Sequence, residues 1–235
     1  MTHFVSLAKI PNFNPLAVPV KGWDAHLPAV PADALTQAAL VQRFAKPPTW
    51  QPEVREEPAF TDRQPRDAAV LVAIVMRPES ESGPTLLLTQ RTDTLSTHSG
   101  QIAFPGGKVD EGETAQQAAL REAREEVGLE GKHVQVLGSL PRYITGTAFH
   151  IIPVVALVQP GFTLQANPAE VADVFEVPLA FLMNPAHHAR HDFEFQGHKR
   201  EWFSMPWQDA QLGHERYIWG ATAGMLRNLY RFLAA

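Results

Sequence analysis

The segment from Gly106 to Gly131, GGKVDEGETAQQAALREAREEVGLEG, constrains the fold more than any other part of the chain. Thr114, followed three residues later by a glutamine, forms a capping-box pattern that marks the start of a helix. Gly128 stands where a C′ glycine ends a helix, and Leu129 can supply the hydrophobic contact behind it. We therefore predict a helix over residues 115–127, directly after a glycine-rich loop.

The expected helix has an apolar face and an acidic face. At about 100° per residue, one side is apolar and suits packing on a sheet; it holds Leu120, Ala123 and Val127. Glu122, Glu125 and Glu126 are related as i, i+3 and i+4, so they share a second side, where like charges repel. A hard divalent cation would stabilise these carboxylates, and oxygen ligands suit Mg²⁺ or Mn²⁺. Taken alone, the same pattern is also typical of a solvated acidic helix face.

The spacing around this helix resembles the Nudix box, the signature of hydrolases that act on a nucleoside diphosphate linked to another group. The matching positions are Gly107, Glu113, Arg121, Glu122, Ala123, Glu125, Glu126, Gly128 and Leu129. The resemblance implies a Mg²⁺ or Mn²⁺ site whose ligands are Glu122, Glu125, Glu126 and the carbonyl of Gly107. It also implies that Glu113 and Arg121 hold the loop onto the helix.

The residues before the box narrow the substrate. The segment from Leu86 to Gly107, LLLTQRTDTLSTHSGQIAFPGG, resembles the upstream motif of the coenzyme A pyrophosphatase subfamily. Two later segments, VFEVPLAFLM and YIWGATAGMLRNL, are similar to that subfamily, so the resemblance covers about residues 67–233. One departure is Ser96, which stands where the subfamily usually has a basic residue. The implied reaction is hydrolysis of coenzyme A or acyl-coenzyme A to 3′,5′-ADP and (acyl-)4′-phosphopantetheine. The implied substrate contacts are Arg91, His98 and Phe104.

Each residue outside the box has a second interpretation. Arg91 could contact a phosphate or pair with the carboxylates of the box. His98 could contact the substrate or donate to backbone carbonyls, and Phe104 could line the pocket or lie in the core. Our first choice of general base is Glu126, on the metal face of the helix. Glu170 is the second, at a place where Nudix enzymes often have another metal-site carboxylate, although it could be a solvated turn residue.

Three functions remain open from the sequence. The first is a metal-dependent pyrophosphatase of coenzyme A, in which both Glu125 and Glu126 are needed for turnover. The second is the same class of enzyme acting on ADP-ribose, NADH or another dinucleotide. The third is a non-catalytic nucleotide-binding module, which the intact set of glutamates disfavours.

Composition excludes several other classes. The net charge of −5 offers no basic field for nucleic acid. The chain has no cysteine, which excludes a thiolate nucleophile, a disulfide framework and a cysteine-based zinc site. No run of about 18 apolar residues predicts a membrane span, and no signal-peptide core stands at the N-terminus, so we expect a cytoplasmic protein. The histidines of HHARH (His187, His188 and His191) lack a matching carboxylate nearby, and we interpret them as a surface loop.

Proline divides the chain into two parts. Ten of the twenty prolines lie in the first 66 residues, which we interpret as a proline-rich N-terminal extension with one helix over Ala32 to Phe44. The Nudix domain is expected over residues 67–235. The extension has too few apolar residues for a core of its own, so it must cover its own domain or a partner subunit. A homodimer is therefore one expectation.

Apolar runs after residue 67 predict an α/β fold. We expect a helix over residues 220–233, and strands over residues 68–76, 85–91, 101–104, 133–140, 150–158, 173–177, 191–196 and 199–205. Pro153 predicts that its strand lies at an edge or carries a bulge. Gly197 and His198 predict a two-residue hairpin turn. The resemblance implies a Nudix-type α/β/α sandwich with a mixed β-sheet, which agrees with this order of elements.

Overall fold

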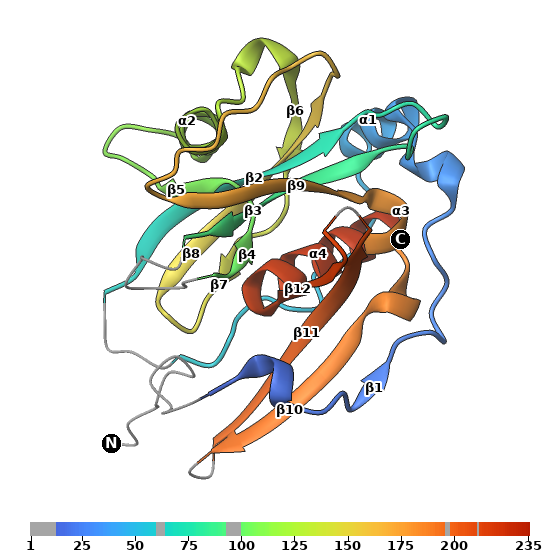
Figure 1. The fold of residues 1–235 in the computed structure, drawn as a ribbon, viewed down its shortest axis with the longest axis vertical. Coiled ribbons are helices and arrows are strands. Elements are labelled where there is room, and N and C mark those ends of the chain that lie inside the picture. The colour runs from blue at the N-terminus through green and yellow to red at the C-terminus, as the bar shows by residue number, and fades with distance from the viewer. Residues whose placement is uncertain (1–12, 60–63, 93–99, 196–197, 211) are drawn as a thin grey trace.

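A computed structural model describes residues 13–59, 64–92, 100–195, 198–210 and 212–235, and its strands form two sheets (Figure 1). His98, Ser96 and Gly197 lie outside the described residues. The predicted hairpin is nevertheless present, because Phe195 pairs with His198 across it. His198 is thus the first residue of a strand and not part of the turn.

The larger sheet has eight strands and is mixed. Its main order is β4-β3-β2-β8-β6, while β5 pairs with β2, β7 with β8 and β9 with β3. Only β2 and β8 run parallel among these pairs; the others are antiparallel. The strands are β2 (Arg66–Val75), β3 (Thr85–Arg91), β4 (Ile102–Ala103), β5 (Gly106–Lys108), β6 (Val134–Ser139), β7 (Tyr143–Ile144), β8 (Phe149–Val158) and β9 (Val171–Pro178).

Helices cover both faces of this sheet, as the sandwich fold predicts. Along β2, Leu71 and Ala73 pack in one apolar cluster with helix α2 (Ala115–Val127). Val72 and Ile74, which alternate with them, pack in a second cluster. That second cluster includes residues of α1 (Gln37–Ala45) and α4 (Gly220–Leu233). The α/β/α sandwich with a mixed sheet is therefore confirmed.

A second, four-stranded sheet covers the other side of α4 (Figure 1). Its order is β1-β10-β11-β12, and all its pairs are antiparallel. Eleven of the fourteen residues of α4 are buried, which is typical of a helix enclosed between two layers. The strands are β1 (Gly22–Trp23), β10 (Ala189–Phe195), β11 (His198–Asp209) and β12 (His214–Trp219). The short helical segments are Pro15–Ala17, Ala32–Leu35, α3 (Leu179–Leu182), Gly131–His133 and Pro185–His187.

The described part of the N-terminal extension packs on its own domain. It supplies β1 to the second sheet, and Val30, Leu35 and Leu40 are buried in the same core as α4. The single helix expected over Ala32 to Phe44 is broken at Thr36, whose side chain accepts a hydrogen bond and caps α1. The homodimer stays a prediction.

The interpretation of HHARH as a surface loop is wrong. His188 is fully buried; its Nε2 lies 2.8 Å from the carbonyl oxygen of Leu182, and its Nδ1 lies 3.0 Å from Arg227 Nη1. His191 is buried in β10, where its Nε2 lies 2.8 Å from Ser204 Oγ. Both histidines meet partners that are distant in sequence, so their burial could not be seen in the local pattern.

Pro153 does not mark an edge strand. Its strand, β8, lies inside the sheet between β2 and the pair β6 and β7. The carbonyl of Pro153 accepts a hydrogen bond from Leu140 N, which follows the end of β6 and precedes β7. Proline has no N–H to return this bond, and the regular pairing of β6 with β8 ends at Ser139, opposite Val154. The register shift of this pairing lies in β6, between Val136 and Gly138.

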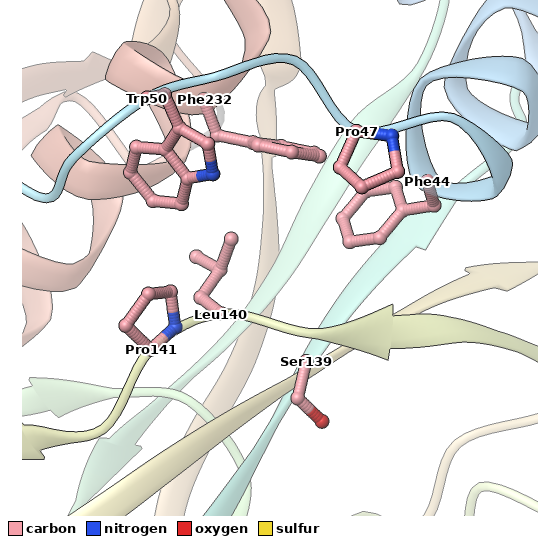
Figure 2. Close-up of a pocket in the computed structure, with 7 residues that line it drawn as sticks. All are labelled: Phe44, Pro47, Trp50, Ser139, Leu140, Pro141 and Phe232. Carbon is pink, nitrogen blue, oxygen red and sulfur yellow. The ribbon is translucent and has the colours of Figure 1, made fainter.

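A cavity of about 380 Å³ lies between the extension and the sheet (Figure 2). Its wall consists of Phe44, Pro47, Trp50, Ser139, Leu140, Pro141 and Phe232. Leu140 and Phe232 belong to the apolar cluster of α1 and α4, whereas α2 packs on the opposite face of the sheet. The cavity is therefore separate from the acidic helix. Among the described residues, no helix is long and apolar enough to cross a bilayer.

Candidate active site

Helix α2 begins and ends at the predicted residues. Thr114 N donates to the side-chain oxygen of Gln117 at 2.9 Å, and Gln117 N donates to the hydroxyl of Thr114, which completes the capping box. Gly128 ends the helix with a φ of 71°, in the left-handed region that favours glycine. These two ends determine which residues of α2 face the glycine loop.

The glycine loop lies directly against the acidic face of α2. Gly106 N donates a hydrogen bond of 3.0 Å to Glu126 Oε2. A side chain at Gly107 would overlap the carboxylate of Glu122, and one at Gly106 would overlap the backbone oxygen of Ala69. At Gly106 the backbone of β2 leaves no room for a Cβ atom, whereas at Gly107 only the flexible side chain of Glu122 stands in the way.

Glu126 is the most buried of the three box carboxylates. Its residue is 4% exposed, and burial raises its pKa to about 7, although the Gly106 N–H and the charge of Arg91 act in the opposite direction. Arg91 Nη1 lies 3.9 Å from Glu126 Oε1. Burial also raises the pKa of Glu122. Glu126 and Glu122 thus both resist ionisation, and each lies beside an arginine, Arg91 for Glu126 and Arg121 for Glu122.

Arg121 binds the loop to the helix, as the resemblance implies. Its guanidinium donates two hydrogen bonds of 3.0 Å to Glu113 and one of 3.1 Å to the carbonyl of Lys108. The same group donates to Glu122 at 2.9 Å and to Glu125 at 3.2 Å. The pairing with Glu125 follows from i, i+4 spacing, but the contact with Glu122 was not predicted. Hydrogen bonding to Arg121 lowers the pKa of Glu113.

The three glutamates offer the oxygen ligands that a hard divalent cation prefers, but their side chains are not arranged around a metal position. Glu122, Glu125 and Glu126 offer only oxygen ligands, and the missing side chain of Gly107 lets Glu122 approach the loop backbone. Within the described ranges, no three His, Cys, Asp or Glu side chains are gathered closely enough to hold a metal ion. Arg121 occupies the space between Glu122 and Glu125, so ligation requires those two carboxylates to turn away from it.

Glu170 comes to the same place from a distant part of the chain. It immediately precedes β9, and its carbonyl accepts a hydrogen bond of 3.1 Å from Thr92 N. The neighbouring Asn167 N donates to the carbonyl of Glu126 at 2.8 Å. After burial, the charge of Glu170 contributes to the raised pKa of both Glu122 and Glu126, so the three carboxylates face one site.

Among the predicted substrate contacts, Arg91 lies at the site and Phe104 does not line an open pocket. Phe104 is 3% exposed and packs in the core cluster of α1 and α4. This agrees with the second interpretation, that of a core residue. Sequence patterns did not reveal Asn167, which ties the Glu170 turn to the end of α2. Its side chain accepts a hydrogen bond from Ala169 N, and its carbonyl accepts one from Glu170 N.

The assembled loop, capped helix and carboxylates agree with comparisons to known proteins. Residues 65–205 match the NUDIX domain family. This chain belongs to the Nudix family. Two relatives are described as the uncharacterized Nudix hydrolase NudL. The one from Cronobacter sakazakii is 43% identical over 70% of this chain and 81% of its own, and the one from Klebsiella pneumoniae 41% identical over 75% and 87%.

Solved Nudix structures are similar over part of the chain. The Nudix hydrolase RenU from M. smegmatis is 28% identical, with a TM-score of 0.42 over 50% of this chain and 73% of its own. The NUDIX domain of Shewanella oneidensis NrtR, solved with ADP ribose, is 21% identical, with a TM-score of 0.38 over 62% of this chain and 84% of its own. Membership of the family makes the chain a Nudix hydrolase of the pyrophosphatase class.

Proposed function

We propose that this Nudix hydrolase cleaves coenzyme A or acyl-coenzyme A within the diphosphate, giving 3′,5′-ADP and (acyl-)4′-phosphopantetheine. The observation that carries the proposal is the position of Arg91. It ends β3, inside the segment that resembles the coenzyme A pyrophosphatase motif, and it lies 3.9 Å from the buried Glu126. The first part of the motif therefore ends with a cation beside the acidic site, and its last two residues, Gly106 and Gly107, form the loop that lies against that site.

Nudix hydrolases generally use divalent metal ions such as Mg²⁺. Here Glu122, Glu125, Glu126 and the Gly107 carbonyl would hold Mg²⁺, or Mn²⁺ in its place. Such a cation, when bound, offsets the charge of the diphosphate oxygens and lowers the pKa of a water molecule. Hydrogen bonds within the chain orient these ligands: Gly106 N–H holds the Glu126 carboxylate, and Arg121 holds the glycine loop on the helix.

A carboxylate must take the proton from the attacking water. We assign this role to Glu126, because a backbone N–H fixes its orientation and its burial excludes bulk water. Glu170 is the second candidate, since it faces the same site from the turn before β9. Glu125, whose side chain is 58% exposed, would serve the metal and not the proton transfer.

Arg91 suits the diphosphate better than the 3′-phosphate of coenzyme A. Its side chain is 27% exposed, and within the described ranges its buried Nε has no hydrogen-bond partner. A guanidinium with this unpaired N–H beside the proposed metal carboxylates is suited to bind phosphate oxygens at the reacting centre. Replacing Arg91 by alanine should therefore weaken cleavage of coenzyme A and of dephospho-coenzyme A to the same extent.

A substrate panel tests the proposal. The protein is incubated with Mg²⁺ and coenzyme A, dephospho-coenzyme A, ADP-ribose or NADH, and the products are identified by mass; the Glu125→Gln variant serves as the blank. We expect 3′,5′-ADP and 4′-phosphopantetheine from coenzyme A. A preference of tenfold or more for ADP-ribose or NADH, about 1.4 kcal/mol, would overturn the coenzyme A assignment and leave the pyrophosphatase class. Cleavage of none of the four would favour a nucleotide-binding module.

A further inference from the structure

Residues 55–57 of the N-terminal extension run beside β7 of the larger sheet. Glu57 N donates to the carbonyl of Ile144 at 2.8 Å, and Ile144 N donates to the carbonyl of Arg55 at 3.0 Å. Glu56 forms a parallel bridge with Ile144. The extension therefore adds a short parallel segment to the strand that precedes β8.

The carboxylate of Glu57 holds the chain between β7 and β8. Tyr143 Oη donates to Glu57 Oε1 at 2.8 Å, and Gly146 N donates to Glu57 Oε2 at 3.0 Å. Tyr143 is 2% exposed, and an added Cβ at Gly224 of α4 would lie 2.5 Å from its hydroxyl oxygen. The hydroxyl is thus confined between α4 and Glu57, and hydrogen bonds to a carboxylate are among the stronger ones in proteins.

The turn that Glu57 holds contains a strained residue. Ala148 has a φ of 65°, in the left-handed region that residues other than glycine rarely adopt. Its carbonyl accepts a hydrogen bond of 2.9 Å from Arg66 N, and Phe149 N donates to the hydroxyl of Thr145 at 3.0 Å. Such a conformation persists only when its surroundings hold it, and strain of this kind is frequent at binding sites.

Strand pairing gives the distance between this turn and the glycine loop of the acidic site. Ala69 of β2 pairs with Gly107 of β5 on one side and with Ile152 of β8 on the other. Because adjacent strands are about 4.8 Å apart, Gly107 and Ile152 are separated by roughly 10 Å. The turn ends at Phe149, three residues or roughly 10 Å before Ile152 along β8, so it lies about 14 Å or more from Gly107. At that distance the segment 143–149 can contact only the part of a substrate that is remote from the diphosphate.

We propose that Glu57 is a positioning residue, which sets the segment 143–149 as a wall of the substrate cleft. The extension, which lies outside the residues 65–205 that match the family, would thereby determine affinity for the part of the substrate remote from the diphosphate. Thr145 is buried and bonded to Phe149 N and to the Thr147 hydroxyl, so the partly buried Thr147 is the polar side chain that this wall can present to an arm rich in hydrogen-bonding groups. The inference rests on the proposed diphosphatase function.

Four variants test the proposal by steady-state kinetics and hydrogen exchange. Glu57→Ala removes both hydrogen bonds, and Glu57→Gln keeps an acceptor for Gly146 N. Glu56→Ala makes the same change at the adjacent, exposed position, and Tyr143→Phe removes only the hydroxyl. We expect Glu57→Ala to raise KM about tenfold while kcat stays within about threefold of wild type. This pattern results when a contact made equally to the substrate and to the transition state is lost. Glu57→Gln should stay within about threefold of wild type in KM, and Glu56→Ala should match wild type.

The outcomes separate this proposal from the proposed function. An unchanged KM in Glu57→Ala, or a fall of kcat as large as that of kcat/KM, would overturn the positioning role. If Glu57→Ala does not fold, Tyr143→Phe carries the same expectation. If wild type cleaves no diphosphate in the panel, the proposed function fails. In that event faster amide exchange over residues 143–149 in Glu57→Ala, with α2 unaffected, supports the positioning role, and unchanged exchange contradicts it.

Discussion

At the scale of single residues, two adjacent glycines of β5 are required for different reasons. A Cβ at Gly106 would overlap the backbone oxygen of Ala69, which belongs to a central strand and cannot move without disturbing the sheet. A Cβ at Gly107 would overlap the carboxylate of Glu122, the far end of a flexible side chain. The first position therefore governs stability and the second governs the site.

Alanine at these two glycines should separate stability from activity. For Gly107→Ala we expect kcat/KM to fall at least about tenfold with a loss of unfolding free energy below about 1 kcal/mol, because only Glu122 must move. For Gly106→Ala we expect a loss of about 1–3 kcal/mol, because backbone must shift. Urea unfolding and steady-state kinetics measure both effects. Wild-type activity in Gly107→Ala would contradict the placement of Glu122 at the metal site.

Removing one charge from the acidic face should abolish turnover and leave the fold intact. Glu125→Gln and Glu126→Gln are each expected to reduce kcat by orders of magnitude at saturating Mg²⁺, because each loses a carboxylate of the proposed metal site. In Glu126→Gln the amide oxygen can still accept from Gly106 N, so this hydrogen bond to the loop is kept. Turnover and melting temperature are measured beside Glu130→Gln, an exposed control just after α2. Near-normal turnover of both variants would refute the assignment.

At the scale of elements, α4 approaches β7 so closely that Gly224 has no room for a side chain. The Tyr143 hydroxyl cannot move away, because Glu57 holds it at 2.8 Å on the far side. Asn228, one turn further along α4, accepts from Val54 N and donates to the carbonyl of Val54. The terminal helix thus packs against the extension and β7 at the same time. Substitutions on this face of α4 should therefore disturb both contacts.

Gly224→Ala should therefore destabilise the protein by about 1–3 kcal/mol, the usual cost of overpacking. In a Tyr143→Phe background the loss should be smaller, because the nearest atom, the hydroxyl oxygen, is gone. Gly131→Ala is the control, since nothing lies within 4 Å of a Cβ built there. Urea unfolding of the single and double variants gives the coupling free energy between Gly224 and Tyr143. Equal losses in both backgrounds would show that the hydroxyl is not the obstacle.

At the scale of the whole molecule, buried ion pairs tie the extension to the C-terminal helix. Arg227 is fully buried; its Nε donates to Glu53 at 2.7 Å, and its Nη2 lies 2.8 Å from Asp24. Glu53 also accepts from Arg190 at 2.8 Å and from Arg231 at 2.6 Å. Burial opposes ionisation of Glu53, but hydrogen bonds from the three arginines outweigh it and lower its pKa to about 2.

This network predicts loss of stability in acid. The folded-state pKa of Glu53 lies below its ordinary value of 4.5, so its contribution is complete above pH 4.5 and is lost as the pH falls towards 2. At 1.36 kcal/mol per pH unit between 4.5 and 2, the contribution is at most about 3.4 kcal/mol, and solvent screening at this partly exposed carboxylate makes it smaller. Urea unfolding of wild type and Glu53→Gln from pH 7 to pH 2 checks this. The difference between them should shrink below pH 4.5, and a constant difference would contradict the shifted pKa.

Burial of His188 also lowers the free energy of unfolding in acid, but at a higher pH than Glu53 does. Desolvation lowers its pKa from 6.5 to about 4, so the folded protein favours the neutral ring. Above pH 6.5 the ring is neutral in both the folded and the unfolded protein. As the pH falls from 6.5 towards 4 the unfolded chain binds a proton that the folded protein does not, so the free energy of unfolding decreases. The acid transition of the wild-type protein should therefore begin near pH 6.5, before Glu53 titrates.

The sequence by itself determined the features that depend on local spacing. The bounds of α2 followed from a capping box and a C′ glycine, and those of β3 and α4 from apolar runs. The shared face of Glu122, Glu125 and Glu126 followed from helical periodicity. These signals act over a few residues, so no knowledge of the rest of the chain was needed.

Only the tertiary structure decided the features that depend on contacts between distant segments. The separation of β10, β11 and β12 into a second sheet, the burial of His188, and the place of Pro153 inside the larger sheet all depend on which strands pair. The same is true of Glu57, whose two hydrogen-bond donors lie more than eighty residues further along the chain. Periodicity predicts which residues share a face, but packing determines what that face meets.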